Sequence, residues 1–218
     1  MSRTLLIAAM MLMASLMFGA ADAQSSEQGT SDGASTAQAA DASHVVDRLD
    51  KALVAAMKGG AKLGYQGRYK LLKPVVEDTY DLTYVAQLSL GSHWSGFDQA
   101  QRKAFVKALA DYTVANYAAQ FDGYSGETFE VQSQQTLRPG IEMVKTRFTS
   151  GGGDKHHQFD YLLHLDNGRW RIINVVVDGV SDLSMKRAEY TQLLQGGGFD
   201  ALLGKLKHFT ESLSKQGG

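Results

Sequence analysis

The order of apolar and polar positions predicts helices in the first part of the folded chain. Apolar side chains recur every three or four residues over 45–57 and again over 66–80, which is the spacing of one buried helical face. A pair of glycines ends the first of these helices, and Pro74 lies inside the second, so the second helix either begins late or is kinked. A shorter helix over 82–90 is expected to end at Gly91.

A longer helix is predicted from residue 99 to about Phe121. Asp98 and Gln101 form the capping-box pattern of a helix N-terminus, and Phe97 precedes them in the position of a hydrophobic staple. One face of this helix is a wide apolar stripe, made of Phe105, Val106, Leu109, Tyr112, Val114, Tyr117 and Phe121. We expect this stripe to face the core or a cavity.

After Gly123 the pattern changes to alternating and β-branched segments separated by short turns. Four strands are predicted, over 128–132, 141–150, 158–165 and 170–177. The turns contain Pro-Gly, Gly-Gly-Gly-Asp and Asp-Asn-Gly, which are hairpin signals, so the strands are expected to form an antiparallel sheet. Helices return over 181–194 and 199–213. The order of helices, strands and helices predicts an α+β domain.

The last predicted strand is more apolar than one buried face requires. Residues 170–177 begin by alternating and then become apolar on both faces, whereas the strand before them keeps one largely apolar face from His157 to Leu165. One face of the sheet must meet helices, and the other is either covered as well or lines a cavity. A well-filled core explains this pattern, and so does an apolar pocket between sheet and helices, because ligand sites are concave and mostly apolar.

The N-terminus has the features of a secretory signal peptide. Arg3 is the only charged residue before an apolar run from Leu5 to Phe18, and Ala21-Asp22-Ala23 places small residues at the cleavage-recognition positions. The apolar run is too short to cross about 30 Å of hydrocarbon as a helix. We therefore predict export to the periplasm, with a cleaved signal peptide over 1–23, a disordered linker over 24–43, a folded domain over 44–213 and a tail over 214–218.

Charge and composition exclude several classes of function. The 218 residues include 22 Lys and Arg and 23 Asp and Glu, giving a net charge of −1, whereas a protein held by nucleic-acid phosphates needs a clustered basic face. Cysteine is absent, which removes disulfides, thiolate metal sites, a cysteine nucleophile and a lipoprotein-type anchor. We expect no nucleic-acid partner, no cofactor and no metal ion.

Two motifs hint at chemistry but fit structural roles better. The segment 179–183, Gly-Val-Ser-Asp-Leu, begins like a nucleophile elbow but lacks the final glycine, so Ser181 is better explained as a helix N-cap. His156, Asp160 and His164 share one face of a predicted strand, but they span roughly 27 Å of chain, too far for one metal ion. No catalytic set is present, and we predict that the protein is not an enzyme.

Several segments are similar to the MlaC family of auxiliary phospholipid-transport proteins, also known as toluene-tolerance proteins. Residues 170–181, Trp-Arg-Ile-Ile-Asn-Val-Val-Val-Asp-Gly-Val-Ser, resemble the signature segment of that family, and 121–126 resemble its helix-to-strand junction. Its C-terminal pattern is matched by Arg187, Tyr190, Leu194 and the helix start over 198–203. The resemblance extends from about residue 44 to residue 213.

The resemblance implies a periplasmic carrier that holds phospholipid acyl chains in a hydrophobic cavity between a curved sheet and helices. Such carriers exchange lipid with an outer-membrane lipoprotein complex and with an inner-membrane ABC transporter that carries an MCE-domain protein, and they serve outer-membrane lipid asymmetry. Segments 72–82 and 124–127 also look like the hopanoid-associated HpnM branch. The ligand that the resemblance implies is therefore a phospholipid or a pentacyclic hopanoid.

We expect a fold that is NTF2-like in general shape, with an internal apolar cavity that binds lipid. The candidate wall residues are Tyr80, Val85, Leu88, Trp94, Leu109, Tyr112, Tyr117, Phe121, Tyr161, Leu163, Trp170, Ile172, Val176, Val180, Met185 and Tyr190. Asn174 and Arg187 are polar candidates near the lipid head group. Two alternatives remain open. One is a secreted NTF2-like enzyme on a small apolar substrate, which needs Asp160 or His164 to face inward. The other is a protein-binding module with a filled core.

Overall fold

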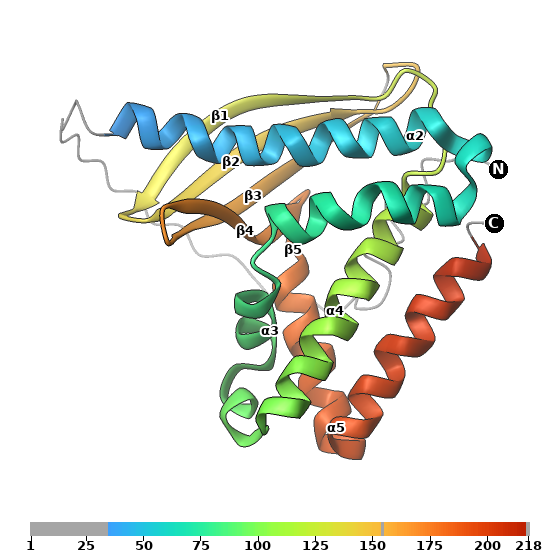
Figure 1. Cartoon of the computed structure of the whole chain (residues 1–218). Helices are drawn as coiled ribbons and strands as arrows, with labels where there is room; N and C mark the ends of the chain where they lie inside the picture. The colour runs from blue at the N-terminus through green and yellow to red at the C-terminus, as the bar shows by residue number, and fades with distance from the viewer. Residues whose placement is uncertain (1–34, 154, 217–218) are drawn as a thin grey trace, which may run out of the picture.

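The computed structural model describes residues 35–153 and 155–216, and its centre is a five-stranded antiparallel sheet (Figure 1). The strands lie in chain order: β1 (Thr128–Arg138), β2 (Ile141–Thr149), β3 (His156–Asp166), β4 (Arg169–Val177) and β5 (Val180–Ser181). Asn167 and Gly168 join β3 to β4 with φ angles of 47° and 75°, the left-handed pair that a two-residue hairpin requires. The predicted α+β sheet is confirmed, with two-residue β5 added to the four expected strands.

Helix α2 (Ser35–Thr79) consists of two helical segments joined at a sharp break. Gly60 and Gly64 adopt φ angles of 39° and 59° there, and the second segment runs back along the first (Figure 1). Arg68 fixes this turn against the rest of the fold, because its buried guanidinium donates to the carbonyl oxygens of Gly60 at 3.0 Å and Ala118 at 2.8 Å. Pro74 lies within the second segment, which remains helical around it.

The start of α2 differs from the predicted domain boundaries. Residues 35–43 are helical although they belong to the predicted linker 24–43, and this stretch is rich in alanine, the residue with the highest helix propensity. The predicted signal peptide over 1–23 and the remaining linker residues lie outside the described residues. At the other end, the helical chain continues through residue 216 into the predicted tail.

The remaining helices extend away from the sheet (Figure 1): α3 (Leu82–Leu90), the 3₁₀ helix η2 (Gly91–Gly96), α4 (Gln99–Gln120) and α5 (Asp182–Gln216). The predicted capping box of α4 is confirmed, since Asp98 accepts from the amide nitrogen of Gln101 at 2.8 Å and the Gln101 side chain accepts from the Asp98 amide at 3.0 Å. The two predicted C-terminal helices are both in α5, which breaks at Gly198. Over 35–153 and 155–216, no helix is both long and apolar enough to cross a bilayer.

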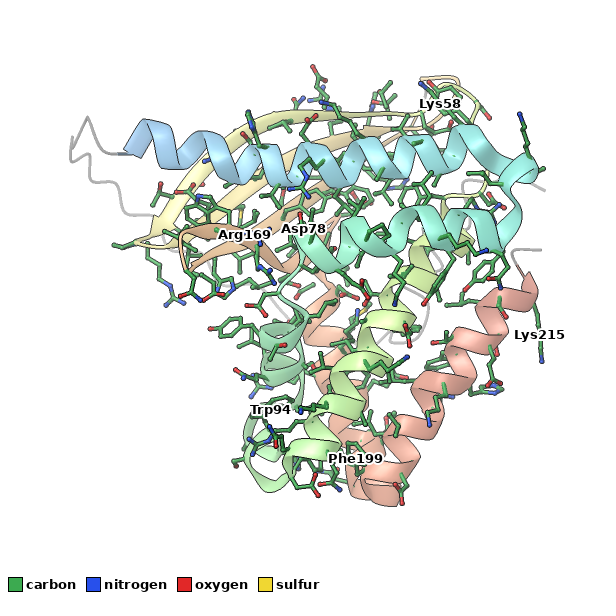
Figure 2. All side chains as sticks on the ribbon, in the orientation of Figure 1. Lys58, Asp78, Trp94, Arg169, Phe199 and Lys215 are labelled. Atoms are coloured by element: carbon green, nitrogen blue, oxygen red, sulfur yellow. The ribbon has the colours of Figure 1, made fainter. Side chains whose placement is uncertain are left out.

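The buried apolar side chains form two hydrophobic cores. The first core packs one face of the sheet, here called the inner face, against α2 and α4, and it includes Leu53, Tyr161 and Ile172. The second core joins α3, α4 and α5 to the sheet at Ile173, and it includes Phe105, Leu109, Tyr190 and Leu202. Figure 2 shows Phe199 at the far end of the second core, where its ring centroid lies 5.0 Å from that of Phe97. Phe97 therefore packs against α5.

A β-bulge at Ile173 reverses the alternation of β4. Ile172 pairs with Leu163 and Asn174 pairs with Leu162, so Ile173 has no partner of its own. The inner face consequently carries Ile172 before the bulge and Val175 after it. Simple alternation places Val176 with Ile172, but the bulge moves Val176 to the opposite face.

Strand β1 forms a free edge of the sheet and is irregular as well. Its pairing with β2 shifts register between Val131 and Ser133, and again between Thr136 and Arg138. Most of its residues are exposed. The edge strand is therefore interrupted twice along its length.

Candidate functional site

A small cavity lies where the inner face of the sheet meets α4. Its walls come from β3 and β4, from one side of α4 and from the first turns of α3 and α5. The apolar and aromatic part of the wall consists of Tyr80, Leu82, Val85, Tyr112, Tyr117, Phe121, Phe159, Val175 and Val177. The cavity thus lies between sheet and helices, where we expected an apolar pocket.

Two tyrosines in the cavity wall form a hydrogen bond with each other. The hydroxyls of Tyr80 and Tyr117 are 2.5 Å apart, and both side chains are buried. Burial raises the pKa of both phenols well above the ordinary value, so both are neutral at physiological pH. Phe121 packs against Tyr117 with ring centroids 5.9 Å apart. The wall is therefore uncharged and aromatic at this point, which suits contact with hydrocarbon.

The cavity has a polar edge. Half-buried Thr113, Asn116 and Gln120 of α4 line it on one side, and Asp182 and Lys186 of α5 line it on the other. The Lys186 ammonium is paired with the Asp182 carboxylate and lies 5.9 Å from the centroid of the Tyr112 ring. This edge offers hydrogen-bonding groups and one ion pair beside an apolar interior, as ligand pockets commonly do.

The cavity is narrow, with a volume of about 40 Å³. Pockets that enclose small-molecule ligands usually measure roughly 300–1,000 Å³, so this space does not hold an acyl chain without widening. The large rings of Tyr80, Tyr117, Phe121 and Phe159 occupy the gap that the sequence led us to expect as a wide cavity. In this conformation the space is therefore intermediate between an open ligand cavity and a fully packed core.

Five of the predicted wall residues line this cavity: Tyr80, Val85, Tyr112, Tyr117 and Phe121. Six others lie in the two cores, with Tyr161, Leu163, Trp170 and Ile172 in the first and Leu109 and Tyr190 in the second. Leu88, Trp94, Val176, Val180 and Met185 are half-buried or exposed and do not line it. For Val176 the reason is the bulge at Ile173.

Several lining residues were missed by the sequence analysis. Asn116 follows Tyr112 by four positions and Gln120 follows Tyr117 by three, so helical spacing was the signal that places them beside the aromatic stripe. Asn174 has a local role: its side chain bonds to the Ser181 hydroxyl at 3.0 Å and accepts from the Leu183 amide at 3.1 Å. Ser181 in turn accepts from the Ser184 amide at 3.1 Å, which confirms its predicted N-cap role.

The sequence analysis also missed a buried carboxyl group that bonds to Tyr161 of the first core. Asp50 of α2 is 4% exposed and accepts a hydrogen bond of 2.8 Å from the Tyr161 hydroxyl. Burial raises the pKa of Asp50 to about 8, although the bond from Tyr161 opposes this rise and the charge of Asp47 adds to it. The sequence signal was an acidic residue directly after Leu49 on an otherwise apolar helical face.

Asp160 and His164, the acid and base named for the enzyme alternative, do not line the cavity. His164 lies on the outer side of β3, where its Nε2 is 3.0 Å from a carboxylate oxygen of Asp81 and its ring stacks on Tyr84 at 4.6 Å between centroids. Asp160 accepts from the Gln158 side chain at 2.9 Å. The inward orientation required for the enzyme alternative is therefore not found at either residue.

Comparison with known proteins identifies the relatives of this chain. A sequence model described as MlaC protein matches residues 47–208. Haemophilus influenzae has a relative named intermembrane phospholipid transport system binding protein MlaC, which is 23% identical over 131 residues, 58% of this chain. The match spans 61% of that relative's length.

A solved structure shares the fold. It is a phospholipid-binding protein from Ralstonia solanacearum in complex with a phospholipid, and it superposes with a TM-score of 0.70 at 16% sequence identity. The superposition covers 80% of this chain and 99% of the other. At this level of identity the likeness establishes the architecture of the sheet and its helices.

Proposed function

The chain belongs to the MlaC protein family, whose sequence model covers residues 47–208, and we propose that it binds phospholipid acyl chains in the cavity between β4 and α4. The observation that carries the proposal is the aromatic and aliphatic lining of that cavity, with charged groups only at its edge. The protein acts as a carrier, since the lipid is transferred without covalent change and no acid–base pair is required.

The physics of lipid transfer explains why such a wall is sufficient. Exposing hydrocarbon to water costs about 0.8 kcal/mol per CH₂ group. Two long acyl chains then cost on the order of 20 kcal/mol, so a phospholipid leaves a bilayer rarely unless apolar side chains replace the bilayer around its tails. Neutral residues such as Tyr117, Phe121 and Val175 provide that replacement.

Lipid entry requires the walls to separate. The cavity is bounded by different elements, with Val175 and Val177 on the sheet, Tyr117 on α4 and Lys186 on α5, so a small displacement of α4 or α5 from the sheet widens it. Such a displacement breaks the bond between the Tyr80 and Tyr117 hydroxyls. We propose that acyl chains take the place of this aromatic contact.

The cellular setting follows from the same proposal. The N-terminal signal features direct the protein to the periplasm, where it moves lipid between the inner and outer membranes. Its partners there are an inner-membrane ABC transporter with an MCE-domain protein and an outer-membrane lipoprotein complex. The ligand is a phospholipid, and a hopanoid is the alternative that mass analysis of the bound lipid distinguishes.

Neighbouring valines on opposite faces of β4 provide the test. Val175→Phe fills the cavity, whereas Val176→Phe adds the same ring on the other face. We expect lipid to co-purify with the wild type and with Val176→Phe in native mass spectrometry, and to be reduced several-fold in Val175→Phe. Circular dichroism checks that both variants fold. A wild type that neither co-purifies with lipid nor takes up labelled lipid overturns the proposal, and full loading of Val175→Phe overturns the location of the site.

A further inference from the structure

A second concave site lies on the outside of the helical region. It is a groove of about 460 Å³, here called the basic groove, formed by the end of α2, the start of α3, η2, one side of α4 and Arg171 of β4. Along α4 its lining runs from Gln99 to Asp111, which is about 18 Å of helix. Figure 2 shows Trp94, which also lines the groove, at the end of α3 remote from the sheet.

The basic groove shares a wall with the apolar cavity. Tyr80 and Leu82 line both spaces; Tyr80 lies in the short connection between α2 and α3, and Leu82 is the first residue of α3. This connection is tied to the sheet by a single backbone bridge between Tyr80 and Ile172, together with a bond of 3.0 Å from the Asp81 amide to the Ile172 carbonyl. The two spaces are therefore separated by little more than the side chains of Tyr80 and Leu82.

The acidic residues of the groove already have partners. Asp111 accepts from Lys107 at 2.5 Å and from Lys73 at 3.2 Å, and Lys73 also pairs with Glu77 at 2.9 Å. Asp81 accepts from the Tyr84 amide at 2.8 Å and lies 3.0 Å from His164. Lys73 and Lys107 offset the charges of Glu77 and Asp111. The remaining charged side chains of the groove are Asp81 and three cations, so the groove keeps an excess of positive charge.

Three cationic side chains of the groove form no ion pair with any residue in the described part of the chain. Arg171 donates to the Tyr80 carbonyl oxygen at 3.4 Å, which places its guanidinium beside the shared wall. Arg102 donates only to the carbonyl oxygens of Trp94 and Ser95, each at 3.1 Å, and its guanidinium lies over the Trp94 ring at 5.3 Å. Lys103 is exposed. Arginine in particular matches phosphate geometry, and its unused N–H groups remain available here.

We propose that the basic groove binds the phosphodiester of the lipid head group, with Arg171 and Lys103 as its cationic contacts, while the acyl chains enter the cavity past Tyr80 and Leu82. This inference rests on the proposed lipid-binding function and adds a head-group site to it, through which lipids that carry a phosphate are preferred over lipids with the same tails and no phosphate. Apolar Leu82, Val106 and Ala110 in the same groove contact the part of the lipid next to the phosphate.

The test compares two labelled lipids in the same vesicle. Phosphatidylcholine vesicles carry equal amounts of labelled phosphatidylglycerol and labelled diacylglycerol with identical acyl chains, and the lipid taken up by the purified protein is counted after gel filtration. The ratio of the two lipids is the readout, because adsorption of protein to the vesicle affects both lipids equally. The test variant is Lys103→Gln with Arg171→Gln. The matched control is Lys62→Gln with Arg147→Gln, two exposed residues outside the groove.

We expect the wild type and the control to prefer phosphatidylglycerol by roughly tenfold, and the test variant to take up both lipids equally while its diacylglycerol uptake is unchanged. If the test variant keeps the preference, or if the wild type has none, the head-group site is overturned and the carrier function stands. If the wild type takes up neither lipid, the carrier function itself fails. Should the paired variant misfold, exposed Lys103→Gln alone is expected to reduce the ratio several-fold, and an unchanged ratio counts against the proposal.

Free phosphate is distinguished in a separate measurement. Inorganic phosphate is titrated into the wild type by calorimetry. Weak binding that is lost in the test variant, together with the lipid preference, supports the head-group site. Phosphate binding without any lipid preference assigns the groove to a soluble phosphate ester and overturns the proposal.

Discussion

The carboxyl of Asp50 is the group whose titration we expect to dominate the pH dependence of stability. It is 4% exposed, and burial raises its pKa from an ordinary 3.8 to about 8. Between these two values the folded state binds a proton that the unfolded state releases, so the free energy of unfolding falls as pH rises from about 4 to about 8 and is constant above that range. At about 1.4 kcal/mol per pH unit, the full loss is roughly 6 kcal/mol.

The substitution Asp50→Asn removes this titration and keeps an oxygen that accepts from Tyr161. We expect the unfolding free energy of Asp50→Asn to exceed that of the wild type by an amount that grows through this window and approaches several kcal/mol above pH 8. Urea unfolding followed by circular dichroism at a series of pH values measures the difference.

Asp47→Asn is the control for this experiment. Asp47 lies one turn away, is partly exposed and pairs with Lys51 at 2.5 Å, so its substitution removes an acidic charge without removing the buried carboxyl. We expect its stability to follow the pH profile of the wild type closely. If Asp50→Asn and the wild type instead give parallel profiles between about pH 4 and pH 8, the carboxyl does not titrate with a raised pKa and the reasoning is refuted.

Three further predictions concern the cavity and the helix ends. Phe121→Leu shortens a side chain in the cavity wall, which widens the cavity and is expected to increase lipid uptake. Phe105→Leu makes the same substitution in the second core and is expected to lower the melting temperature without changing lipid uptake. Equal lipid uptake in the two variants contradicts the location of the lipid site. Asp98→Ala removes the capping box of α4 and is expected to lower the free energy of unfolding, measured in urea, by about 1 kcal/mol. An unchanged free energy of unfolding shows that the cap does not stabilise the fold. Gly91→Ala places a Cβ 3.0 Å from the Arg187 guanidinium at a φ of 54°, so we expect at least about 1 kcal/mol of destabilisation. A melting temperature equal to that of the wild type argues against strain there.

The ends of helices and strands could be predicted from the sequence wherever one characteristic residue marks them. Gly91 caps the end of α3, Asp98 caps the start of α4, and Asn167 with Gly168 forms the turn between β3 and β4. These signals are local, because each depends on the backbone preference or hydrogen bond of one or two residues. Strand order followed as well, since short turns leave antiparallel neighbours as the only pairing.

The site was predictable only in part, because it depends on packing between distant segments. Tyr112, Tyr117 and Phe121 belong to the predicted stripe of α4 and line the cavity. The bulge at Ile173 has no local signal, so alternation selected Val176 where the cavity is lined by Val175. The volume of the cavity depends on how the rings from α4 and the sheet fit together, and spacing along a chain carries no information about that fit.

The irregular pairing of β1 affects how this molecule behaves in a crowded solution. A regular outer strand presents an unbroken row of free amide and carbonyl groups, which recruits a strand from another molecule and begins aggregation. The register shifts after Val131 and after Thr136 divide that row into short stretches that twist out of line. An approaching chain finds too few consecutive partners to add itself to the sheet, so the irregular pairing disfavours edge-to-edge association.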